Sequence, residues 1–167
     1  MFRSILVPYD SSPASITALE VAVEMAAAGA GSVTALVADE PVVDWAAAGF
    51  AVPGAAGALL DARESTAKSC LADAEARIPE GIRHRVVLGH GRPADSVLAE
   101  LVTGHQDVVV IGNRGHGNAG ALILGSVSHD VVRRSPVPVL VVRADMRTRA
   151  ADGDASTVSD PAEAMAG

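Results

Sequence analysis

The sequence predicts an α/β fold in which a doubly wound, five-stranded parallel sheet carries helices on both faces. Short apolar segments alternate four times with segments of helical periodicity, and a further apolar segment closes the order. Aromatic residues make up only 2% of a chain that is 49% apolar, so the core must consist of Val, Leu, Ile and Ala. Aliphatic cores of this kind are typical of parallel sheets, whose strands are buried on both faces.

The predicted elements follow one another along residues 1–143, which we expect to form one domain. Strands are expected at residues 5–7, 32–38, 83–88, 108–111 and 137–142. Helices are expected from Pro13 to about Gly29, over 61–77, from Pro93 to Gly104, and from about Gly125 to Arg134. Residues 39–60 are expected to be irregular, with no role that the sequence defines, and residues 144–167 to form a disordered tail because aliphatic periodicity stops there.

Helix boundaries follow from capping and breaking residues. Ser12 before Pro13 marks a helix start, because proline lacks only an N–H group that would be unpaired at that position. Glycines after residue 28 end this first helix, and Pro79 with Gly81 ends the second. Pro136 stops the last helix, whose final turn carries arginines that complement its negative end.

Strand positions in the sheet follow from residue patterning. The segment 108–111 is uniformly apolar, which indicates a central strand, whereas basic and apolar residues alternate over 83–88, which favours a position near an edge. Pro138 cannot donate a ladder hydrogen bond, so the last strand is expected at the other edge. A second copy would cover this apolar edge, and we therefore expect a homodimer through the strand from Val137 to Val142.

Composition limits the function classes. The formal net charge of −7 disfavours a nucleic-acid partner, which would require a basic stripe. No apolar stretch approaches the ~20 residues of a membrane span, and the first residues lead directly into a strand, so we expect a soluble, cytoplasmic protein without a membrane partner. The single cysteine, Cys70, is expected to be a small buried apolar residue, and no metal-binding cluster of cysteines is present.

A glycine-rich loop after the fourth strand is the segment most suggestive of ligand binding. Gly112-Asn113-Arg114-Gly115 is followed by nine residues and then by Gly125-Ser126-Val127-Ser128. Glycines allow the backbone to approach a phosphate closely, and the free N–H groups of a helix start favour an anion. Arg114 and His116 can add charge, and two serines can add hydroxyl donors. From the residues alone, phosphate binding and a turn that binds nothing remain equally open.

This spacing resembles the ATP-binding signature of the universal stress protein family. The opening segment 5–12, the tripeptide Gly91-Arg92-Pro93 and the closing segments 124–128 and 135–142 are similar to the corresponding parts of that family. The resemblance covers about residues 1–143, although residues 39–60 match nothing distinctive. It implies a UspA-type domain of the ATP-binding subclass, with a Rossmann-like fold of the adenine nucleotide alpha-hydrolase-like group.

The resemblance also implies ATP as the ligand and a role for each matching residue. Asp10 would hold the ribose, Val37 would present backbone groups to adenine, and the glycines would line the ribose and phosphates. The full set of implied ligand residues is Pro8, Asp10, Val37, Gly112, Arg114, Gly115, His116, Gly125, Ser126, Val127 and Ser128. Mg²⁺ or Mn²⁺ would accompany the triphosphate through its phosphates.

Several functional alternatives remain open. A non-catalytic ATP-binding regulator or nucleotide sensor is favoured because the sequence shows no convincing catalytic base, while a slow ATPase and a ligand-free structural stress dimer are the alternatives. The sequence does not separate ATP from ADP, AMP or cyclic AMP.

A dinucleotide motif over 115–120 is rejected because it follows the fourth strand and its helix begins late. Asp10 is interpreted as a ligand residue rather than a helix cap, because Ser12 is better placed for the cap.

Overall fold

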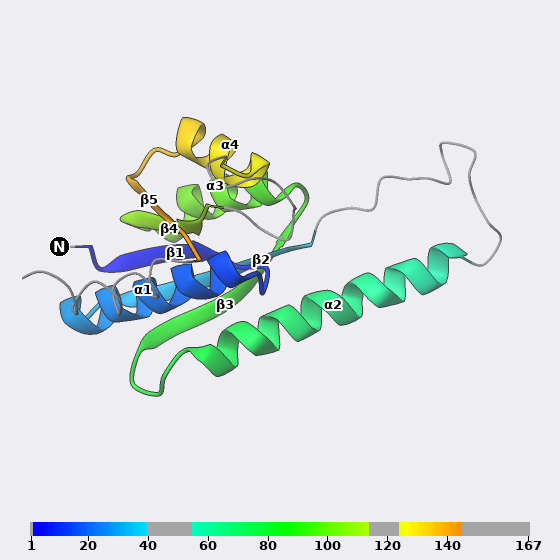
Figure 1. The fold of residues 1–167 in the computed structure, drawn as a ribbon, viewed down its shortest axis with the longest axis horizontal. Coiled ribbons are helices and arrows are strands. Elements are labelled where there is room, and N and C mark those ends of the chain that lie inside the picture. The colour runs from blue at the N-terminus through cyan, green and yellow to red at the C-terminus, as the bar shows by residue number, and fades with distance from the viewer. Residues whose placement is uncertain (1, 40–54, 114–123, 145–167) are drawn as a thin grey trace, which may run out of the picture.

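The computed structural model describes residues 2–39, 55–113 and 124–144 (Figure 1). Within these residues, strands and helices alternate as the sequence predicts. The strands are β1 (Ser4–Pro8), β2 (Ser32–Asp39), β3 (Arg83–His90), β4 (Val108–Gly112) and β5 (Val139–Val142). The helices are α1 (Pro13–Gly29), α2 (Ala55–Arg77), α3 (Pro93–Gly104) and α4 (Ser126–Arg134).

The five strands form one parallel sheet in the order β3-β2-β1-β4-β5, which confirms the predicted fold class. The chain winds from β1 outward through β2 to β3, and then returns to place β4 on the other side of β1. The winding therefore reverses between β1 and β4. In sheets of this kind the carboxyl ends of the strands at such a reversal form the usual ligand crevice.

The core is divided between the two faces of the sheet. Ile5 and Val7 on β1 pack with α1 and α2, whereas Leu6 between them packs with α3 and α4. Figure 1 shows the same division, with α1 and α2 on one side of the sheet and α3 and α4 on the other. Residues alternate between the faces of a strand, so an apolar run is buried on both sides. All three of these side chains are fully buried.

The edge positions of the outer strands are as predicted. β3 pairs with β2 alone, and β5 pairs with β4 alone. The last strand nevertheless begins at Val139, not at Val137, so the expectation that Pro138 lies inside it is wrong. Pro138 contributes only its carbonyl oxygen, which accepts a hydrogen bond from the Val109 amide at 3.0 Å, because it has no N–H group to donate.

Other boundaries also differ from the expectations, most clearly the start of α2. Helix α2 begins at Ala55, not at Asp61, so the last part of the segment expected to be irregular is helical. Alanine and leucine dominate residues 55–60, and their high helix propensity outweighs the single Gly57. Strands β2 and β3 extend together to Asp39 and His90, since their ladder continues through these last pairs. Residues 40–54 and almost all of the expected tail lie outside the described residues.

The turn between β1 and α1 is capped as predicted. Ser12 is the N-cap of α1, and its hydroxyl oxygen accepts a hydrogen bond from the Ser15 amide at 3.3 Å. Pro13 occupies the first turn of the helix, where its missing N–H group removes no helical hydrogen bond. Asp10 lies in this turn, directly after the central strand of the sheet.

Candidate functional site

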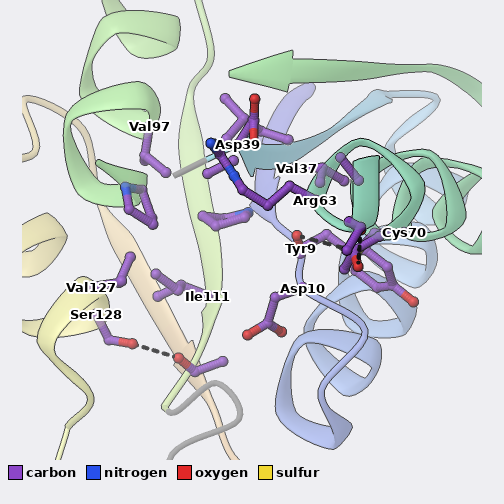
Figure 2. A pocket seen from close by; sticks show the side chains of 18 residues that line it. Tyr9, Asp10, Val37, Asp39, Arg63, Cys70, Val97, Ile111, Val127 and Ser128 are labelled. Atoms are coloured by element: carbon purple, nitrogen blue, oxygen red, sulfur yellow. Dashed lines mark hydrogen bonds and ion pairs between the residues drawn. The ribbon is translucent and has the colours of Figure 1, made fainter. Parts of the chain in front are cut away.

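A pocket of about 560 Å³ opens where the winding of the sheet reverses. Its walls come from the β1–α1 turn, the end of β2, one face of α2 and the first turns of α3 and α4 (Figure 2). This volume lies within the range of about 300–1,000 Å³ that small-molecule sites usually have. The fold thus places the pocket at the position expected for a ligand in a doubly wound sheet.

The floor of the pocket is mainly apolar. Its apolar lining residues are Leu36, Val37 and Ala38 of β2, Val97 of α3 and Ile111 of β4. At one rim, Arg63 of α2 forms an ion pair with Asp39 at 2.6 Å, and both side chains are about a quarter to a third exposed, at 23% and 32%. This ion pair joins α2 to the end of β2 beside the apolar floor. A flat, apolar ligand group fits such a surface.

The start of α4 forms the opposite wall. Gly125 is the N-cap of this helix, and glycine has no side chain with which to cap the first N–H groups. The Gly125 amide donates to the Asn113 carbonyl at 2.8 Å, which joins the start of α4 to the end of β4. Backbone N–H groups at a helix start, together with the positive end of the helix dipole, attract anions.

Ser128 connects the same two elements from inside the protein. Its hydroxyl donates to the Gly112 carbonyl at 2.7 Å, and the side chain is buried. The hydroxyl hydrogen of Ser128 is therefore used in a bond to the backbone, whereas its oxygen can still accept a hydrogen bond. Gly112 itself packs against α1, since a Cβ atom there would lie 2.8 Å from the carbonyl carbon of Ala14. Close packing of β4 against α1 is thus by itself a reason for glycine at position 112.

Asp10 points into the pocket from the β1–α1 turn (Figure 2). One of its carboxylate oxygens accepts a hydrogen bond from the Ser12 amide at 3.0 Å, and its own amide donates to the Ser15 hydroxyl at 3.3 Å. The side chain is exposed. These contacts fix the backbone of the turn and leave a negatively charged group at the pocket wall.

The chain matches the model of the universal stress protein family over residues 1–143. It belongs to the universal stress protein family. A curated relative from Thermus aquaticus, the universal stress protein in the QAH/OAS sulfhydrylase 3′ region, is 37% identical over 144 residues, which cover 86% of this chain and 100% of that protein.

Solved structures of the same family share the fold. Universal stress protein UspA from Lactobacillus plantarum has a TM-score of 0.70 at 24% identity, covering 85% of this chain and 98% of that one. A universal stress protein in complex with cAMP has a TM-score of 0.63 at 26% identity, covering 84% and 97%. A universal stress protein family protein from Arabidopsis thaliana with AMP bound has a TM-score of 0.63 at 15% identity, covering 87% and 94%.

The structure brings together most of the ligand residues that the family resemblance implies. Those that line the pocket are Pro8, Asp10, Val37, Gly112, Val127 and Ser128. Gly125 lies at the start of α4, and Ser126 lines a small adjoining recess together with Arg92. The expectations for Arg114, Gly115 and His116 fall outside the described residues.

The α2 wall of this universal stress protein was not anticipated from the sequence. The α2 residues that line the pocket are Ala62, Arg63, Thr66, Ala67 and Cys70. They recur at helical spacing, which was a signal for a common face, but the same spacing is equally typical of a helix packed on a core. Cys70 is buried as expected and also touches the pocket, and burial raises the pKa of its thiol.

Tyr9 lies at the base of the pocket with its ring almost completely buried, at 3% exposure. Its hydroxyl donates a hydrogen bond to Asp73 of α2. Burial and this contact with the carboxylate raise the pKa of Tyr9 to about 12, because both disfavour a phenolate. Tyr9 is the only tyrosine in the chain, so its ionisation can be followed without interference from other phenols.

Residues 2–39, 55–113 and 124–144 contain no group of three or more His, Cys, Asp or Glu side chains that could hold a metal ion. In the same ranges, no helix combines the length and the apolar character that a membrane crossing requires.

Proposed function

We propose that this universal stress protein binds an adenine nucleotide, ATP in particular, and acts as a non-catalytic regulator or nucleotide sensor in the stress response of the cytoplasm. The observation that carries the proposal is the pocket between β1, β2 and β4, because it joins an apolar floor to the start of α4, whose N-cap is a glycine. A nucleotide has the matching division between a flat, weakly polar base and a strongly anionic phosphate chain.

The division of the pocket suggests how the nucleotide would lie. Adenine would rest on the floor beside Val37, and the ribose hydroxyls would face the Asp10 carboxylate. The phosphates would extend toward the N–H groups at the start of α4, over residues 125–128. The glycine-rich loop, with Arg114, Gly115 and His116, would complete the phosphate site. Two structurally similar proteins carry cAMP and AMP, which supports an adenine nucleotide as the ligand class.

A divalent ion would be held chiefly by the phosphate oxygens of the nucleotide. Mg²⁺ and Mn²⁺ prefer oxygen ligands and usually retain several waters when bound beside a nucleotide. The described residues offer no cluster that would hold such an ion alone. The ion would neutralise phosphate charge, and the chain would orient the nucleotide.

The pocket favours binding over catalysis. Hydrolysis of ATP requires a base or a group that orients the attacking water. The two carboxylates that line the described pocket are Asp10, which accepts a hydrogen bond from the turn, and Asp39, which is paired with Arg63. Neither lies on the α4 side, where the phosphates would be held. A slow ATPase remains the alternative function, and a ligand-free structural dimer is the third.

A titration of nucleotide-free protein with ATP and Mg²⁺ tests the proposal, with ADP, AMP and cyclic AMP titrated in parallel. We expect saturable binding at one site per chain, weaker for AMP than for ATP because the helix start interacts with the longer phosphate chain. Phosphate release measured on the same samples should stay at the rate of the protein-free control. Absence of binding for all four nucleotides would overturn the proposal, and steady phosphate release would favour the slow ATPase.

We also propose that two copies of the chain associate through the edge strand β5. Leu140 on this strand is 41% exposed and Val132 on the neighbouring α4 is 45% exposed, so the edge carries apolar surface. A second β5 strand would cover both the apolar side chains and the unpaired backbone groups. The variant Leu140→Lys should shift the mass measured by light scattering from dimer to monomer. A monomeric parent protein would contradict this assembly.

A further inference from the structure

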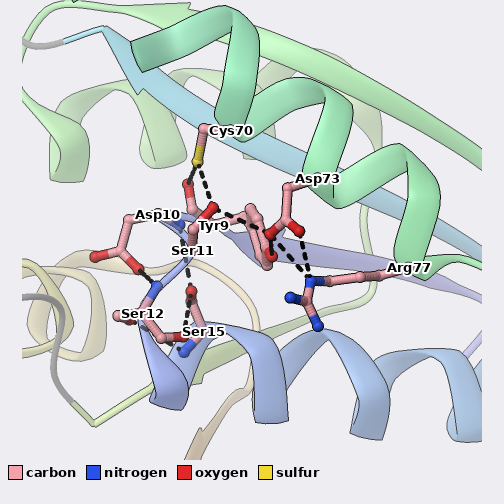
Figure 3. A network of polar contacts seen from close by, with 8 residues as sticks. All are labelled: Tyr9, Asp10, Ser11, Ser12, Ser15, Cys70, Asp73 and Arg77. Carbon is pink, nitrogen blue, oxygen red and sulfur yellow. Dashed lines mark hydrogen bonds and ion pairs between the residues drawn. The ribbon is translucent and has the colours of Figure 1, made fainter.

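Asp73 of α2 contacts the β1–α1 turn on both sides of Asp10 (Figure 3). Its Oδ2 atom accepts hydrogen bonds from the Tyr9 hydroxyl and from the Ser11 hydroxyl, the latter at 3.1 Å. Arg77, one helical turn further along α2, donates from Nε to both carboxylate oxygens at 3.0 Å. One carboxylate thus joins α2 to two residues of the turn that carries the predicted ribose ligand.

The turn depends on support of this kind. Ser11 has a φ angle of 60°, in the left-handed region that residues other than glycine rarely adopt. Such a conformation costs free energy and persists when surrounding contacts hold it in place. The Ser11 hydroxyl lies 3.2 Å from the Cys70 thiol as well as donating to Asp73, so two α2 side chains hold the strained residue.

The direction of Asp10 follows from its neighbours. Tyr9 and Ser11 both reach toward α2, whereas Asp10 between them is directed away from Asp73 and lines the pocket (Figures 2 and 3). If the contacts to Asp73 are lost, Ser11 can leave its left-handed conformation, and the backbone on both sides of Asp10 then rotates. Asp73 itself is absent from the pocket lining, so it would act on a ligand through Tyr9 and Ser11, the two residues that it holds.

We propose that Asp73 is a positioning residue of the nucleotide site, which holds Tyr9 and Ser11 so that Asp10 presents its carboxylate to the ribose hydroxyls. This inference rests on the proposed function, since it requires a nucleotide in the pocket. A negative charge suits the role, because an ionised carboxylate accepts several hydrogen bonds at once. The hydrogen bonds from Arg77 and then Tyr9 hold the pKa of Asp73 below its usual range, which keeps it ionised.

The variant Asp73→Ala tests the inference, with Glu64→Ala as its matched control. Both substitutions remove a carboxylate from α2 that pairs with a basic residue four positions later, Arg77 or Lys68. The measurement is the ratio of dissociation constants for 2′-deoxy-ATP and 3′-deoxy-ATP relative to ATP. A lost hydrogen bond to a charged group usually lowers affinity about tenfold or more. We therefore expect ATP affinity to fall about tenfold in Asp73→Ala while the ratios approach one.

Ionisation of Tyr9 gives a second readout that needs no nucleotide. Ultraviolet titration of the single tyrosine should show a lower pKa in Asp73→Ala than in the parent, because a carboxylate that disfavours the phenolate is gone. Burial of the ring should keep this pKa above the ordinary value. The Glu64→Ala control should retain both the parent nucleotide ratios and the parent tyrosine titration.

The outcomes separate the inference from the proposed function. If the parent binds none of the nucleotides, the proposed function fails. If the parent binds them without distinguishing the deoxy analogues, or if Asp73→Ala weakens all of them equally, Asp73 has no positioning role and the inference is overturned. Should Asp73→Ala fail to fold, Tyr9→Phe keeps the buried ring and removes one of the contacts. Tyr9→Phe should bring the ratios of the deoxy-ATP dissociation constants to that of ATP closer to one than in the parent. Unchanged ratios would also overturn the inference.

Discussion

Replacing Gly112 with alanine should lower the free energy of unfolding by about 1–3 kcal/mol, the usual cost of adding a methyl group where there is no space for it. A Cβ atom at this position would lie 2.8 Å from the carbonyl carbon of Ala14 and 2.9 Å from its oxygen. These are backbone atoms in the first turn of α1, and they cannot move without displacing the helix. The effect should therefore appear in stability even without a ligand.

The matched control is Gly57→Ala in α2. Nothing lies within 4 Å of a Cβ atom placed there, and the residue is exposed in a helix. Alanine should stabilise this position by about 0.5–1 kcal/mol, because glycine loses more conformational freedom in a helix. Urea unfolding of both variants against the parent measures the two effects. Equal stability of Gly112→Ala and the parent would show that α1 and β4 are not packed this closely.

The sequence was sufficient for the order of elements and for the sheet edges. Apolar runs such as 108–111 can be buried on both faces only in a covered sheet, and capping by Ser12 depends on neighbouring residues alone. The location of the pocket followed from the same information, because a reversal of winding requires only the strand order. Local signals of this kind are strong when the residues that interact lie close together in the chain.

The α2 wall and the support of the turn could not be predicted in the same way. Tyr9 and Asp73 lie 64 positions apart, and nothing in the spacing of either residue indicates the other. The close approach of Gly112 to α1 is also a tertiary contact, so this glycine was interpreted only as a ligand residue. Helical periodicity placed Cys70 on a buried face, but it could not tell that part of this face borders a pocket.

Filling the pocket from α2 should remove nucleotide binding. Ala67 lines the pocket and is half-buried, so a tryptophan at this position must place its indole where the nucleotide would lie. We expect Ala67→Trp to weaken ATP binding at least about 100-fold, which corresponds to about 2.7 kcal/mol. Ala76→Trp is the matched control, since Ala76 is an exposed residue of the same helix that does not line the pocket.

Calorimetric titration of ATP with Mg²⁺ into the parent, Ala67→Trp and Ala76→Trp tests the central claim most directly. Thermal unfolding of the three proteins should first show that each is folded. The pocket between β1, β2 and β4 is the nucleotide site if the parent and Ala76→Trp bind ATP alike and Ala67→Trp does not. Undiminished binding by a folded Ala67→Trp would place the nucleotide elsewhere on the protein and contradict the account.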